Sequence, residues 1–276
     1  MKKAIIAVVS LFLAVMVICS VFSESIGALL ANVIYKEKVS VYSPANKASS
    51  ATLKKNDYIY FGKFNGEPIL WRVISVDENG NPLLLSERAI CFMPFNAGKT
   101  VTANSADWKS STIRQWLNSG ESKTFEFACN PANKIKNDTV TVSGGFLCEN
   151  NFTAEEISAI KDGEDKVFLP TTKMLSGMTL KQKQKSPTAA AVINEASPHL
   201  HFRSRCWYWT QTPISTNTSS VTAVTTSGGY YKSLANDGIM GVCPAVYLEG
   251  CEISVCGGNG SVKTPYIFNA EGIINE

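Results

Sequence analysis

The N-terminal part of the chain combines two basic residues with a long apolar run. Lys2 and Lys3 precede a hydrophobic stretch from Ile5 to Phe22. This order is typical of a secretory signal, and the run also approaches the roughly 20 residues that cross a bilayer. A signal cleaved after Ser23 and an uncleaved membrane anchor both remain open. Either one places the rest of the chain outside the cytoplasm.

The next hydrophobic segments have the pattern of consecutive antiparallel strands. Residues 57–64 are rich in Tyr, Ile and Phe, and Asn65-Gly66 follows them as a two-residue turn. Residues 68–76 form the returning strand, and residues 83–86 form a third. The chain from Cys91 to Lys109 is irregular.

Three short helices are expected in the middle of the chain. Ser110 or Ser111 caps the first, which carries Ile113, Trp116 and Leu117 on one face. The second begins at Thr153, and Glu156 completes its capping box. The third runs from Ser186-Pro187 to Ala196, because proline fits the first helical position.

The last third alternates between short apolar segments and glycine-rich turns. The expected strands cover residues 167–169, 207–210, 221–226, 230–231 and 245–248. Strands and short helices alternate without a regular βαβ order, which indicates an α+β domain with mixed, mainly antiparallel sheets, two or three short helices and long loops.

A polar stretch of small residues separates this domain from the N-terminus. It runs from Ser43 to Ser50 and has the composition of a linker. We divide the chain into a signal peptide or membrane anchor over residues 1–31, a linker over 32–51 and a single α+β domain over 52–276.

Charge gives little information about partners. The chain has 26 basic and 23 acidic side chains, and two of the basic ones, Lys2 and Lys3, belong to the N-terminal segment, so the remainder carries a net charge of +1. This excludes the strongly basic surface of a nucleic-acid-binding protein. We expect the membrane to be contacted only through the N-terminal segment.

Histidine and cysteine provide weak candidates for chemistry. His199 and His201 are the only histidines, and in an extended segment both would face one metal ion. No third ligand has a fixed spacing from them, so exposed loop histidines are the simpler interpretation, and we expect no cofactor. Cys251 and Cys256 bracket a strand-like segment about 16 Å long, too long for a disulfide between them.

Aromatic residues favour a binding module. Trp207, Trp209, Tyr230 and Tyr231 could present flat faces to sugar rings. Asn236 and Asp237 are candidate polar neighbours for such a ligand. Packing in the hydrophobic core is the alternative for each aromatic ring, since tryptophan buries a large apolar area.

The order of these segments resembles a known family. The shared motifs include Asp57-Tyr58-Ile59-Tyr60-Phe61-Gly62, Leu70-Trp71-Arg72-Val73, Trp207-Tyr208-Trp209 and Gly241-Val242-Cys243-Pro244-Ala245. Over about residues 52 to 250 the chain is similar to the exported bacterial family called domain of unknown function 6273. That resemblance implies a C-type-lectin-like fold of the kind found in sulfatase-modifying factors, and no established activity.

Two segments depart from the family pattern. Thr210-Gln211-Thr212-Pro213 stands where the family tends to have Leu-Arg-Ser-Pro, and Cys243 stands in place of an arginine. A site or core ion pair built on those arginines would be missing here. Cys206 lies near these changes, so a Cys206–Cys243 disulfide is one expectation, Cys129–Cys148 is another, and buried thiols are the alternative.

Three functions remain open. The first is a non-catalytic extracytoplasmic module that binds a cell-surface glycan or protein. The second is a Cys/His-dependent or metal-dependent enzyme of the sulfatase-modifying-factor type. The third is a structural surface component. Fold alone does not decide among them.

Overall fold

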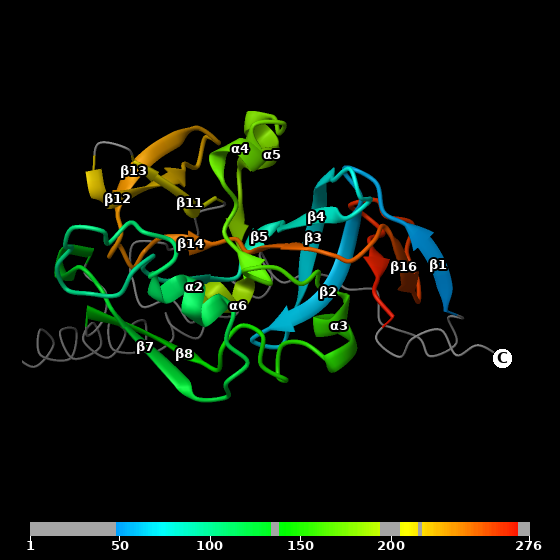
Figure 1. Cartoon of the computed structure of the whole chain (residues 1–276), viewed down its shortest axis with the longest axis horizontal. Helices are drawn as coiled ribbons and strands as arrows, with labels where there is room; N and C mark the ends of the chain where they lie inside the picture. Colours follow the sequence, from blue (N-terminus) through cyan, green and yellow to red (C-terminus); the bar gives the residue numbers. More distant parts are fainter. Residues whose placement is uncertain (1–47, 134–137, 194–204, 215–216, 270–276) are drawn as a thin grey trace, which may run out of the picture.

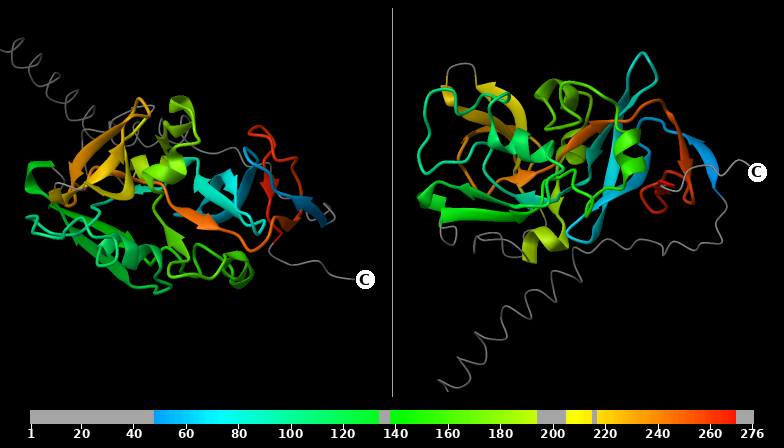
Figure 2. Two further views of the ribbon diagram at one scale, coloured as in Figure 1. Left: turned by 45° about the horizontal axis from the view of Figure 1, so that its top comes forward. Right: turned by 60° about the horizontal axis from the view of Figure 1, so that its bottom comes forward.

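Two mixed β-sheets lie at opposite ends of the domain and are joined by segments that cross between them (Figures 1 and 2). The computed structural model describes residues 48–133, 138–193, 205–214 and 217–269. The six-stranded sheet has the order β17 (Tyr266–Ile267), β2 (Tyr58–Phe64), β3 (Glu67–Val76), β4 (Pro82–Ser86), β15 (Ala245–Tyr247) and β9 (Val167–Phe168). The five-stranded sheet has the order β13 (Tyr230–Leu234), β12 (Asn217–Val224), β11 (Tyr208–Ile214), β14 (Gly241–Val242) and β6 (Cys91–Phe92).

Smaller pairs and short helices complete the described part of the chain. The two-stranded pairs are β1 (Ser49–Thr52) with β16 (Glu252–Val255), β5 (Arg88–Ala89) with β10 (Ser186–Pro187), and β7 (Thr124–Ala128) with β8 (Thr139–Ser143). The helices are α2 (Thr112–Leu117), α3 (Ala154–Ala159), α4 (Thr172–Leu175), α5 (Leu180–Lys183), α6 (Ala189–Ile193) and the 3₁₀ turn η1 (Pro131–Asn133).

The chain passes between the two sheets in both directions. β4 belongs to the six-stranded sheet and β6, a few residues later, to the five-stranded sheet. β14 and β15 make the reverse connection, with Cys243 and Pro244 at the crossing. β14 pairs with β6, and β15 pairs with β4, so the two connections lie side by side.

The first hairpin confirms the strand prediction. β2 and β3 pair antiparallel with Phe64 opposite Glu67, which leaves Asn65 and Gly66 as the turn. Both turn residues have positive φ, +48° and +78°. This is the type I′ geometry that matches the twist of the strands. β4 then pairs antiparallel with β3, as predicted.

Two of the three helix predictions are confirmed. Ser111 caps α2 by accepting a hydrogen bond from the Arg114 N–H, and Thr153 caps α3 in a capping box with Glu156. The third prediction is wrong at its start. Ser186 and Pro187 form β10, parallel to β5, and α6 begins only at Ala189. Pairing with β5 fixes this dipeptide in an extended conformation, which the favourable helix position of proline does not outweigh.

Two other expectations are corrected. Residues 49–51, assigned to the linker, belong to β1, which pairs with β16. No disulfide joins the described cysteines, so the expected Cys129–Cys148 and Cys206–Cys243 bonds are absent. The Cys129 thiol instead donates to the Phe127 carbonyl at 3.2 Å, and the Cys206 thiol approaches the Lys185 carbonyl at 3.7 Å.

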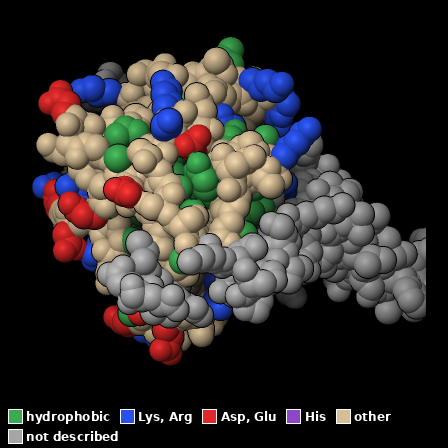
Figure 3. Space-filling model, turned by 90° about the vertical axis from the view of Figure 1, so that its right-hand side faces the viewer, with side chains coloured by type: hydrophobic (Ala, Val, Ile, Leu, Met, Phe, Trp, Pro, Cys, Tyr) green, Lys and Arg blue, Asp and Glu red, His purple; other side chains and the backbone are tan. Residues whose placement is uncertain are grey.

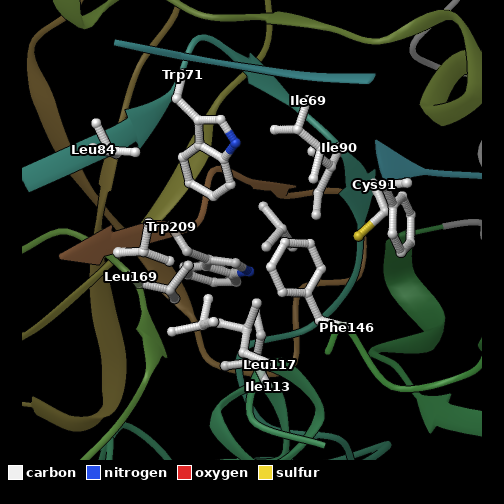
Figure 4. Close-up of a cluster of buried hydrophobic side chains, with 14 of the residues drawn as sticks. Ile69, Trp71, Leu84, Ile90, Cys91, Ile113, Leu117, Phe146, Leu169 and Trp209 are labelled. Carbon is white, nitrogen blue, oxygen red and sulfur yellow. The ribbon is translucent and has the colours of Figure 1, made fainter. Parts of the chain in front are cut away.

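The main hydrophobic core lies between the two sheets. Trp71 from β3 and Trp209 from β11 both point into it, and both are fully buried (Figure 4). Ile113 and Leu117 from α2 and Phe146 close the same cluster. Each tryptophan also donates its indole N–H to a backbone carbonyl, Trp71 to Phe61 and Trp209 to Met93. The core therefore fixes the relative position of the two sheets.

The domain is mainly β, with short helices and mixed sheets, which confirms this part of the predicted fold class. On the face shown in Figure 3, basic and acidic side chains both occur, and hydrophobic side chains are visible in small separate patches. Within the part of the chain that the structure describes, no helix is long and apolar enough to cross a membrane. The apolar run from Ile5 to Phe22 lies outside that part.

Candidate binding groove

Two of the predicted ligand-binding residues line one small pocket, and a third packs against one of them. Trp207 and Asp237 line a pocket of about 290 Å³, and Arg205 lies at the same pocket. Tyr231 packs edge-on against Trp207, with ring centroids 5.7 Å apart. The Asp237 carboxylate accepts a hydrogen bond from the Ser233 hydroxyl at 2.8 Å. We call this the Trp207 pocket.

The other predicted residues lie elsewhere. Trp209 belongs to the core and has no exposed surface for a ligand, which is the alternative that the sequence left open for each aromatic ring. Tyr230 lies under the Lys183 ammonium, 4.7 Å from its ring centroid. Asn236 is buried and donates to the Gly98 carbonyl at 3.0 Å. His199 and His201 lie outside the described residues.

A larger concave surface is formed by two pockets that share two residues. One, of about 370 Å³, contains Asp165, and the other, of about 490 Å³, contains Pro213. Trp108 and Gln211 line both. We call the pair the Trp108 groove and its two parts the Asp165 pocket and the Pro213 pocket. Such volumes are in the range of ligand sites in proteins.

Trp108 is held in place by the turn that precedes α2. Asp107 accepts hydrogen bonds from the Ser110 hydroxyl and backbone N–H, at 2.8 and 3.2 Å. The hydrogen bond from Ser110 lowers the pKa of Asp107. The Trp108 carbonyl accepts from Ser111, the N-cap residue of α2. The Trp108 ring packs against Phe95, with centroids 6.0 Å apart, and remains partly exposed.

The indole N–H of Trp108 is oriented by Asp165. It donates to Asp165 Oδ2 at 2.9 Å, while Arg114 Nε contacts Asp165 Oδ1 at 2.7 Å. Asn118 holds the same loop, because its side-chain oxygen accepts from the Lys166 and Val167 N–H groups. A ring and a carboxylate are therefore fixed together at the edge of the groove.

The Asp165 pocket combines an apolar floor with an acidic rim. Phe168 and Tyr247 form part of the floor, with ring centroids 5.9 Å apart. Burial raises the pKa of Tyr247 above its ordinary value, so its hydroxyl stays protonated at neutral pH. On the rim, Asp162 forms an ion pair with Lys166, and the hydrogen bond from Lys166 lowers the pKa of Asp162.

Gln211 offers an amide at the junction of the two pockets. Its backbone N–H donates to the Pro170 carbonyl at 3.1 Å, which fixes this part of β11. Among the described residues, its side-chain amide has no hydrogen-bond partner. An amide in this state can donate to and accept from a ligand at once.

Two chemical roles can be compared with the side chains of the groove, general acid catalysis and metal binding. A general acid that cleaves a glycosidic bond needs a raised pKa, and the pKa of Asp162 is shifted in the opposite direction. Among the described side chains, no group of three His, Cys, Asp or Glu residues is placed to hold a metal ion. Aromatic surface, fixed carboxylates and an amide are the groups the groove offers.

Sequence reasoning missed this groove because its residues come from distant segments. Trp108 lies in the stretch from Cys91 to Lys109 that has no regular pattern, and Gln211 was noted only as a departure from the family motif. Asp165 and Tyr247 are far from both in sequence. A tryptophan in a polar loop was the one local signal, and it does not identify its neighbours.

The chain is thus a mainly-β domain with an aromatic and acidic groove at its surface. Residues 79–250 match the family described as Domain of unknown function (DUF6273), and the chain belongs to this family. The matched segment contains every residue of the Trp108 groove and of the Trp207 pocket. No curated protein and no solved structure matches the chain.

Proposed function

We propose that this protein is a non-catalytic binding module that holds a carbohydrate in the Trp108 groove. The observation that carries the proposal is the position of Trp108, whose partly exposed ring lies at the junction of two pockets and is oriented by Asp165. Sugars present apolar C–H faces that pack on aromatic rings, and hydroxyl groups that donate to carboxylates. The groove has both kinds of group in fixed positions.

The proposed location is outside the cytoplasm of a bacterium. The basic and apolar N-terminal pattern supports export, with the protein either secreted or held at the membrane by this segment. A C-type-lectin-like fold is part of the proposal and rests on the order of the sequence motifs. A glycan of the cell surface is the proposed partner.

An enzyme that uses cysteine is less well supported. A nucleophilic thiol needs a lowered pKa and access to solvent. Cys129 and Cys243 are buried, and burial raises the pKa of each to about 12. A bound metal ion in the purified protein, measured by mass spectrometry, would reopen the enzymatic hypothesis.

The test is a comparison of two tryptophan variants of the full chain on a glycan array. Trp108→Ala is expected to weaken binding at least about tenfold, which corresponds to about 1.4 kcal/mol. Trp207→Ala is the matched control, because it removes a partly exposed tryptophan from the other pocket. The proposal is wrong if a folded Trp108→Ala protein binds as the wild type does, or if only Trp207→Ala abolishes binding.

A further inference from the structure

The two halves of the Trp108 groove have the same kind of lining. In the Asp165 pocket, Met174 and Phe168 provide apolar surface beside the carboxylate of Asp162. In the Pro213 pocket, Pro213 and Ile214 provide apolar surface. Its polar rim contains Asn104 and Thr218. Each half therefore offers an apolar floor for one sugar ring and polar groups for its hydroxyls.

The junction between the halves is suited to a ligand that passes through it. Trp108 and Gln211 line both pockets, so a molecule bound across the groove contacts both of these side chains. A single small ligand would occupy one pocket, since each is by itself about the size of a small-molecule site. A chain of repeating units would fill the two pockets and cover the junction.

The charge of the lining disfavours an anionic chain. Four carboxylates line the groove, from Asp107, Asp162, Glu164 and Asp165. Three of them have basic partners: Lys166 pairs with Asp162, Arg114 with Asp165, and Lys109 with Glu164. Glu164 and Lys109 form an exposed ion pair at 3.2 Å. Lys161, the other lysine of the lining, lies 3.7 Å from Glu249. Each basic group of the lining among the described residues therefore already has an acidic partner, and a polymer with a carboxylate or sulfate on each unit would gain no complementary charge here.

We infer that the Trp108 groove binds an internal segment of an uncharged linear oligosaccharide, with one sugar unit in each pocket. This inference rests on the proposed function and specifies its ligand. The Asp165 pocket and the Pro213 pocket act as two subsites, and the affinity of the protein depends on the length of the chain.

Titration calorimetry on the full chain tests the inference. The probes are gluco-, manno- and N-acetylglucosamine oligomers with β-1,4 linkages, from one to six units, and oligogalacturonate as the anionic chain. For a neutral series that binds, Kd is expected to fall at least about tenfold from the single sugar to the tetramer, since the second subsite adds its own contacts. Oligogalacturonate is expected to bind more weakly than the neutral tetramer.

Variants in each subsite complete the test. Met174→Ala changes only the Asp165 pocket, and Asn104→Ala changes only the Pro213 pocket. Both are expected to weaken tetramer binding by at least about threefold and to reduce the advantage of the tetramer over the single sugar. Thermal unfolding of each variant verifies that it is folded.

Two results overturn the inference while leaving carbohydrate binding intact. One is that the single sugar and the tetramer bind with equal affinity and that Trp108→Ala abolishes the binding of both. The groove would then contain a single subsite. The other is tighter binding of oligogalacturonate than of any neutral tetramer. Failure of every probe at every length would instead contradict the proposed function itself.

Discussion

The ammonium group of Lys185 lies 3.0 Å from the carboxylate of Glu87, and the Lys185 side chain has no exposed surface. Glu87 also accepts two hydrogen bonds from Arg72, at 2.8 and 3.0 Å. Arg72 lies in β3, Glu87 directly follows β4, and Lys185 directly precedes β10. The network therefore ties the six-stranded sheet to the pair formed by β5 and β10.

Breaking this network at Glu87 should strongly destabilise the protein. Glu87→Gln leaves the buried Lys185 cation without a counter-charge, and losses of this kind cost about 3–5 kcal/mol. Lys185→Met should cost less, about 1–3 kcal/mol, because Glu87 keeps Arg72 and is 21% exposed. Urea unfolding of both variants gives the two values.

The double variant separates the ion pair from general packing. Once Lys185 is methionine, Glu87→Gln leaves only the Arg72 cation without its partner and no longer Lys185 as well, so its cost should fall by more than about 1 kcal/mol. If the costs of the two single variants simply add in the double variant, the two side chains act independently. That result would contradict the ion pair seen between them at 3.0 Å.

Two glycines of the first hairpin should respond differently to the same substitution. Gly62 and Gly66 both have positive φ, +66° and +78°, so alanine strains the backbone at either position by about 1–2 kcal/mol. A Cβ on Gly66 would meet open space, whereas one on Gly62 would lie 2.1 Å from a ring carbon of Phe152. Phe152 is buried and packs against both Phe61 and Phe146, so moving its ring aside would disturb these contacts.

Gly62→Ala should therefore lower the free energy of unfolding by about 1–3 kcal/mol more than Gly66→Ala does. Because backbone strain is common to both variants, their difference reports the clash with Phe152. Equal losses in denaturant unfolding would mean that the ring accommodates the methyl group.

Trp207 and Trp209 should differ in their effects on stability, because only Trp209 is fully buried. Trp209→Ala removes a fully buried ring and its hydrogen bond to Met93, with an expected loss of about 3–5 kcal/mol. Trp207→Ala removes a partly exposed ring and should cost about 1 kcal/mol. Guanidinium unfolding measures both, and a larger loss for Trp207→Ala would contradict the assignment of Trp209 to the core.

Local patterns predicted the elements whose causes are local. The turn at Asn65-Gly66 and the capping box of Thr153 and Glu156 follow from a few adjacent residues, and both were found in place. Ser186-Pro187 was misassigned because its conformation depends on β5, almost a hundred residues away. The β7–β8 hairpin was not identified in the sequence at all.

The candidate site could be predicted from the sequence even less well than the fold. The aromatic residues near Trp207 were identified by type, yet burial divides them among the core, the Trp207 pocket and the contact with Lys183. Trp108, Asp165 and Gln211 are brought together only by the packing of α2, the loop before β9 and β11. Since each position alone is unremarkable in the sequence, this groove required the tertiary structure.

The buried thiols should make the protein less stable as the solution becomes alkaline. Burial raises the pKa of Cys243 to about 12 from an ordinary value of 9.0. The folded state thus retains a proton that the unfolded state loses above pH 9, and stability falls as pH rises toward 12. The expected slope is about 1.4 kcal/mol per pH unit for each such thiol.

Cys243→Ala isolates this contribution, because alanine does not titrate and any packing loss is the same at every pH. Urea unfolding between about pH 7.5 and 10.5 under reducing conditions should give a shallower decline for the variant than for the wild type above about pH 9. Below about pH 8 the two curves should run parallel, since the thiol is then mostly protonated in both states. Parallel curves over the whole range would show that the Cys243 thiol ionises as readily in the folded protein as in the unfolded chain. That result would contradict the burial of Cys243 at the crossing between the two sheets.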